Sequence, residues 1–195
     1  MNNFIERPIL FSGEMVRAIL EGKKTQTRRV VPEKIINKHR VYEEWCVSNL
    51  PNVQNNRGYE EQFFFCHCPY VRRDRLWVRE THAIINREGL HTTVYKADQN
   101  EANQNRWTPS IHMPRWASRI SLEITGVRVE RLQDISRGDC MSEGCPFPNR
   151  AKETDPVRWF SELWSSVYGE ENWFDNPWVW VIEFKIIDKK AGSDN

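Results

Sequence analysis

The sequence predicts a mixed α+β domain in which several strands bend and about three helices pack against them. Three observations predict this class. A short amphipathic helix ends at Gly22 and is followed by residues that alternate as in a strand. A later strand changes its apolar side at Gly126, which indicates a bulge or sharp bend. An amphipathic helix from Asp155 to Gly169 precedes a last alternating strand.

The first helix and the strand after it are the clearest elements. Ser12 suits the N-cap position and Gly22 the left-handed C-cap. The strand then spans residues 25–31. Its alternation places Thr25, Thr27 and Arg29 on one side, and Gln26 and Arg28 on the other.

Two segments interrupt the regular pattern, at about residues 32–72 and 86–118, and we expect both to be loop-rich insertions. A strand over residues 75–85 separates them. The second insertion includes a possible hairpin strand from Thr92 to Tyr95.

The carboxyl-terminal half is more regular. It contains the bent strand over 119–132, a short helix with Ser136 as N-cap that ends near Gly144, the helix from Asp155, and a strand from Trp178 to Ile187. We therefore expect a single domain over residues 1–188 and a disordered tail over 189–195.

Composition limits the classes of function. A net charge of +1 excludes a strongly basic protein, so any contact with nucleic acid is expected to be local. Residues 17–29 carry five cations against one acid, so we expect any such contact with nucleic acid in this segment. No run of about 18 apolar residues and no signal-peptide core are present, so a cytoplasmic protein without a membrane role is expected.

The five cysteines favour a reducing compartment, because they are an odd set without the density of a secreted scaffold. Cys66 and Cys68 flank His67, but no second pair follows at zinc-finger spacing. We expect no metal and no other cofactor.

The segment from Gly22 to Arg29 resembles a family motif. The pattern G-x-K-T-x-T-x-R is met by Gly22, Lys24, Thr25, Thr27 and Arg29. Together with the order of the other elements, it is similar to the ASCH domain family, which implies a small bent β-barrel related to the PUA fold. Residues 8–29 and 113–120 also resemble longer phage and prophage members of that family.

One branch of that family consists of acetylcytidine amidohydrolases with a Lys base, a Thr nucleophile and a Glu acid. The resemblance assigns these catalytic roles to Lys24, Thr27 and Glu143. Other members are thought to bind or cut RNA. A nucleoside or an RNA is thus the implied ligand.

The residues themselves are compatible with amide hydrolysis, which needs a nucleophile, a base, an acid and a cation for the oxyanion. Arg29 shares the strand side of Thr27 and can hold the oxyanion. Lys24 can act as a base only if burial or nearby cations lower its pKa. Lys23, Thr25 and Arg28 are further candidate contacts for substrate.

Three residues outside the motif are also candidates for substrate binding. Glu80 lies in an apolar strand and is either a substrate contact or a member of a structural salt bridge. Arg115 and Trp116 are adjacent, as in sites where an aromatic ring stacks on a base and an arginine binds phosphate.

Three functions remain open from the sequence. The preferred one is hydrolysis of an acylated pyrimidine nucleoside. The second is an RNA-binding module or ribonuclease that uses the same basic segment. The third is a phage protein that binds another protein through its aromatic-rich insertions.

Overall fold

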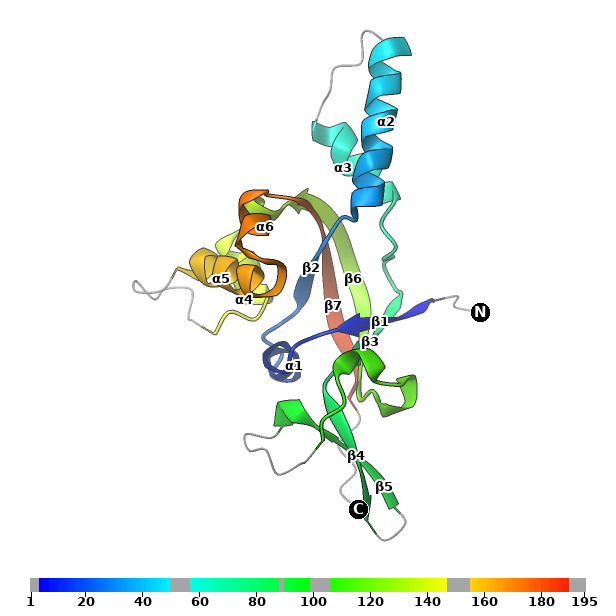
Figure 1. Cartoon of the computed structure of the whole chain (residues 1–195), viewed down its shortest axis with the longest axis vertical. Helices are drawn as coiled ribbons and strands as arrows, with labels where there is room; N and C mark the ends of the chain where they lie inside the picture. The colour runs from blue at the N-terminus through cyan, green and yellow to red at the C-terminus, as the bar shows by residue number, and fades with distance from the viewer. Residues whose placement is uncertain (1–3, 50–56, 88–89, 99–105, 147–154, 190–195) are drawn as a thin grey trace.

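The computed structural model describes residues 4–49, 57–87, 90–98, 106–146 and 155–189 (Figure 1). The α+β class is confirmed, but this part of the chain holds six α-helices where about three were expected. They are α1 (Gly13–Leu20), α2 (Glu33–Asn49), α3 (Arg57–Cys66), α4 (Arg137–Ser142), α5 (Pro156–Tyr168) and α6 (Glu170–Phe174). Short 3-10 turns cover Lys96–Asp98, Ser110–His112, Arg115–Ala117 and Leu132–Asp134.

The main sheet has five strands in the order β1-β3-β6-β7-β2. Their bounds are β1 (Glu6–Leu10), β3 (Arg75–Arg79), β6 (Ile120–Arg131), β7 (Trp178–Lys189) and β2 (Gln26–Val30). β1 runs parallel to β3, and the other neighbours are antiparallel. The expected small bent β-barrel is corrected to an open, bent sheet, because β1 and β2 remain its two edges among the described residues.

The bend of β6 occurs at Gly126, as the change in its apolar pattern predicted. Ile124 pairs with Phe184 and Gly126 pairs with Glu183, so Thr125 is an extra residue in the ladder. Such a bulge bends a strand and increases its twist. A Cβ on Gly126 would lie 2.5 Å from the carboxylate of Glu183, so the Glu183 side chain would have to move to admit a larger residue here.

The first insertion is not loop-rich, and that expectation was wrong. Helices α2 and α3 occupy much of it and lie at one end of the sheet (Figure 1). Many of their charged residues are exposed, so the apolar pattern is weak, and the attachment depends on a few aromatic side chains. Phe64 is 1% exposed and packs with Trp178 and Trp180, whose indole Nε1 donates a hydrogen bond to the Phe64 carbonyl.

The second insertion begins with a hairpin at the opposite end of the sheet, built from β4 (His82–Arg87) and β5 (Leu90–Tyr95) (Figure 1). The expected hairpin strand at 92–95 is confirmed. The single strand expected over 75–85 is divided, because the chain leaves the main sheet after Arg79.

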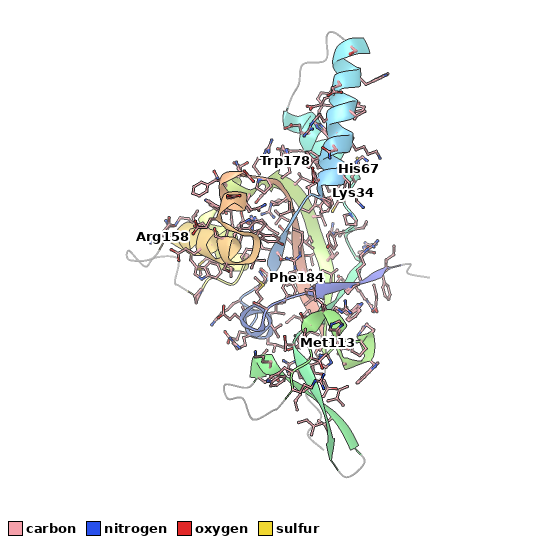
Figure 2. The ribbon with its side chains drawn as sticks, viewed as in Figure 1. Lys34, His67, Met113, Arg158, Trp178 and Phe184 are labelled. Atoms are coloured by element: carbon pink, nitrogen blue, oxygen red, sulfur yellow. The ribbon has the colours of Figure 1, made fainter. Side chains whose placement is uncertain are left out.

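Two helices cover the part of the sheet that positions the site. Val16 and Ile19 of α1 pack with Phe184 of β7, which is labelled in Figure 2. Phe160 and Trp164 of α5 pack against the valines of β7. Within the described ranges, no helix is both long and apolar enough to cross a membrane.

Candidate active site

The turn after α1 brings the cationic segment against the end of α4. Gly22 has a φ of +73°, which ends the helix, and the amide of Lys24 then donates to the carbonyl of Ala18. The next amide, of Thr25, donates to the carbonyl of Ser142 at 2.8 Å. Lys24 and Glu143 form an isolated antiparallel β-bridge, so residues 119 positions apart in the sequence become neighbours.

Lys24 and Glu143 form a buried ion pair. The Lys24 Nζ lies 2.6 Å from Oε2 of Glu143 and donates a second hydrogen bond to the Glu143 carbonyl at 2.9 Å. The two side chains are only 1% and 4% exposed. Burial lowers the pKa of Lys24 against the opposing pull of Glu143, and the charges of Arg29 and Arg28 lower this pKa further.

Arg28 fixes the other oxygen of Glu143. Its Nη1 donates to Oε1 of Glu143 at 2.9 Å, and its other nitrogens bind Glu130. Asp139 lies 3.5 Å from the same guanidinium and also accepts from Gln26. Arg28 has no exposed side-chain surface. Through its bonds it joins Glu143, at the C-cap of α4, to Glu130 of β6.

Thr27 and Arg29 lie on the other side of β2, as the strand alternation predicted. Arg29 Nη1 donates to Thr27 Oγ1 at 3.1 Å, and Nη2 donates to the carbonyl of Leu10 at 2.9 Å. Both residues, together with Glu143, line a cavity of about 590 Å³. A hydroxyl, a guanidinium and a carboxylate therefore meet the same cavity.

Aromatic residues form much of the wall of this cavity. Phe11 lies next to the site, with Lys24 Nζ 5.7 Å and Arg29 Cζ 5.4 Å from its ring centre. Trp164 and Tyr168 of α5 stack with their ring centres 4.4 Å apart. Tyr70 and Phe160 also line the cavity.

The sequence pattern did not single out these aromatic residues. For Phe160, Trp164 and Tyr168 the signal was the i, i+4 spacing on α5, but a helix shows the same apolar stripe whether it faces a core or a cavity.

Several predicted site residues lie elsewhere. Lys23 and Thr25 are exposed, and Lys23 pairs with Glu21. Glu80 is 1% exposed and binds both Nε and Nη2 of Arg119 at 2.9 Å, as the structural alternative for it proposed.

Arg115 and Trp116 also lie apart from the cavity, because neither lines it. Arg115 pairs with Glu6 at 3.1 Å, and Trp116 is 63% exposed. The structure thus brings together Lys24, Thr27, Arg28, Arg29 and Glu143.

One group of side chains in the described ranges offers metal-ligand atoms. His39, Glu43 and Glu60 place such atoms within 4.8 Å of one another, on α2 and α3. His39 Nδ1 lies 3.5 Å from Glu43, so an ion pair within α2 also accounts for this arrangement. The group lies apart from the cavity that Thr27 lines.

No family model matches the sequence, and no curated protein matches it. Among solved structures, the chain is similar to the crystal structure of an ASCH domain from Lactobacillus crispatus JV V101. The identity is 12%, the TM-score is 0.42, and the match covers 93% of this chain and 79% of that chain. That solved structure is an ASCH domain, the family that the motif at residues 22–29 resembles.

Proposed function

We propose that this chain is an ASCH-type amidohydrolase that removes the acyl group from the exocyclic amine of an acylated pyrimidine nucleoside. One observation carries the proposal. The hydroxyl of Thr27, held by Arg29, lines the same cavity as Glu143, whose carboxylate binds the buried amine of Lys24. The aromatic wall of that cavity suits a planar base.

The short contact between Lys24 and Glu143 supports their roles as base and acid. Transfer of one proton from Nζ to the carboxylate, over 2.6 Å, leaves a neutral amine and a neutral carboxylic acid. Burial favours the neutral amine, as the lowered pKa of Lys24 indicates. One shared proton thus prepares both the base and the acid.

Acylation of the enzyme would then proceed in one step. Lys24 accepts the hydroxyl proton while Thr27 Oγ1 attacks the amide carbon, and Arg29 donates to the developing oxyanion. Glu143 gives its proton to the exocyclic nitrogen as the C–N bond breaks. The nucleoside leaves, and Thr27 carries the acyl group as an ester. Because Lys24 donates to Glu143 in the structure, its amine must turn toward Thr27 during this step.

Deacylation would reverse the proton transfers. The Glu143 carboxylate accepts a proton from water as the water oxygen attacks the ester. The Lys24 ammonium returns a proton to Thr27 Oγ1 as the ester bond breaks. The carboxylic acid product leaves, and the neutral pair is restored.

Incubation with N4-acetylcytidine tests this function, with cytidine and acetate measured as products. The proposal predicts turnover by the native protein and loss of about three orders of magnitude or more in Lys24→Ala, since the base and its proton are removed. Lys23→Ala, which removes an exposed neighbouring cation, is the matched control. Undiminished turnover by Lys24→Ala would exclude this mechanism, and no turnover by the native protein would exclude the substrate.

The alternative, an RNA-binding module or ribonuclease, has less support from the geometry. Lys23, Lys24 and Arg28 each pair with a carboxylate, so three of the four cations in residues 22–29 are compensated. A groove that grips a phosphate backbone needs uncompensated cations. Steep weakening of single-stranded RNA binding as salt rises would favour this alternative over hydrolysis.

A further inference from the structure

We propose that the natural ligand of the cavity is a nucleoside monophosphate, and that Arg79, Thr81 and Ser110 bind its phosphate. The placement of the base and the amide rests on the proposed function. The phosphate site itself can be tested by binding alone, without any turnover.

The charges around the cavity favour an anion. Four charged residues line it: Arg28, Arg29, Arg79 and Glu143. Glu143 is already paired with Lys24 and Arg28. Among the described residues, no carboxylate lies within ion-pair distance of Arg29 or Arg79. A neutral nucleoside would leave both of these cations uncompensated, whereas one phosphate supplies the missing negative charge.

The guanidinium groups of Arg29 and Arg79 differ in how many of their nitrogens already donate hydrogen bonds. Arg29 is engaged with Thr27 Oγ1 and the carbonyl of Leu10, so it belongs to the reacting end of the site. Arg79 donates only its Nε, to the carbonyl of Met113 at 3.1 Å, and its guanidinium lies 5.1 Å from the Trp77 ring centre. In the described ranges, its two terminal nitrogens make no hydrogen bond. Such a guanidinium is oriented and keeps the fork that binds two phosphate oxygens.

Two hydroxyls complete the phosphate site. Thr81 follows Arg79 by two residues, and Ser110 begins a 3-10 turn from a distant part of the chain. Both line the cavity, and neither side chain makes a hydrogen bond within the part of the chain that the structure describes. One guanidinium and two hydroxyls of this kind are common phosphate ligands.

The size of the cavity favours a mononucleotide over a longer strand. Its volume of about 590 Å³ is typical of small-molecule sites, which span roughly 300–1,000 Å³. A cavity of this size holds one nucleotide, and the binding of an oligonucleotide is tested below against it.

Calorimetric titration with cytidine and with cytidine 5′-monophosphate is the first test. The proposal predicts that the monophosphate binds about tenfold or more tightly, and that this preference falls as salt rises. Arg79→Gln should reduce the ratio of the two dissociation constants by about tenfold, to a value near one. Arg72→Gln, which removes an exposed cation nearby in sequence, controls for long-range charge. Equal affinities in the native protein would overturn the proposal.

A second arm keeps the test valid if Arg79→Gln is poorly folded. Ser110→Ala removes only one hydroxyl and should reduce the same ratio by a few fold. An unchanged ratio in both variants would overturn the assignment of these residues.

Turnover separates this inference from the proposed function. The substrates are N4-acetylcytidine, its 5′-monophosphate and a short oligoribonucleotide with one central acetylcytidine. A higher kcat/KM for the monophosphate supports the inference, while preference for the oligonucleotide or for the free nucleoside overturns it. Tight binding of cytidine 5′-monophosphate without any hydrolysis would remove the proposed function and keep the phosphate site.

Discussion

The Lys24 Nζ lies 2.6 Å from Oε2 of Glu143, although 119 residues separate them along the chain. The contact exists because the backbone after α1 pairs with the end of α4. Both side chains are almost completely buried, so each ion depends on the other for compensation.

Removal of one partner of the Lys24–Glu143 pair should destabilise the fold strongly. Glu143→Gln leaves the buried Lys24 without a carboxylate, which costs about 3–5 kcal/mol in the free energy of unfolding. The double variant Lys24→Met/Glu143→Gln should lose less than the sum of the two single variants, because no uncompensated lysine remains. Urea unfolding of the four proteins measures this coupling. Additive losses would contradict the pairing.

The kcat/KM for acetylcytidine should decline at alkaline pH. The active pair holds one proton, so activity is lost when that proton dissociates. Burial lowers the pKa of Lys24 from its usual value of 10.5, so the alkaline decline should occur below that value. A rate profile that stays flat up to pH 10.5 would contradict these roles. Lys23→Met should keep the native profile.

Gly144 should tolerate a side chain less well than Gly22. Both have positive φ, +99° and +73° respectively, so alanine is strained at each by about 1–2 kcal/mol. At Gly144 the new Cβ would also lie 3.0 Å from Ala18 Cβ and 3.3 Å from Lys24 Cβ, whereas nothing lies within 4 Å at Gly22. Thermal unfolding of the two alanine variants compares them directly. An equal loss of stability would contradict the close packing of α4 on the Lys24 turn.

Asp139 should make the fold sensitive to acid. Burial alone would raise the pKa of Asp139, but hydrogen bonds from Ser136 and Gln26 and the charges of Arg128 and Arg28 lower it below 3.8. A lowered pKa in the folded state means that the unfolded state binds the proton more tightly. This contribution to stability is therefore present above pH 3.8 and is lost as the pH falls through the folded-state value.

The melting temperature measured between about pH 5 and pH 2 should therefore fall less steeply in Asp139→Asn than in the native protein. Asp175→Asn, at an exposed position after α6, controls for the loss of one carboxylate. Parallel curves of melting temperature against pH for Asp139→Asn and the native protein would contradict the contribution of Asp139 to stability.

Local signals in the sequence predicted the local parts of the fold. The caps Ser12 and Ser136, the bulge at Gly126 and the helix from Asp155 depend on neighbouring residues and are confirmed. Helices α2 and α3 were missed, since their attachment through Phe64 and Trp178 depends on contacts distant in sequence. The open edges of the sheet could not be predicted either, because pairing between strands is a property of the whole fold.

The candidate site was only partly predictable for the same reason. The family resemblance indicated Lys24, Thr27 and Glu143, and alternation along β2 correctly separated Arg28 from Arg29. The sequence could not show that Arg28 fixes Glu143, because that contact spans 115 residues. Trp116 was expected to stack on a base, but Trp164 lines the cavity and Trp116 does not. The sequence around each tryptophan is also typical of an ordinary packing residue, so it could not distinguish them.

The most direct test of the central claim is mass spectrometry of the protein quenched in acid during turnover of N4-acetylcytidine. Our account predicts a population heavier by one acetyl group, with the ester located on Thr27 and absent from Thr27→Val. An unmodified native protein that still turns over the substrate, or an acetyl group on another residue, would contradict Thr27 as the nucleophile.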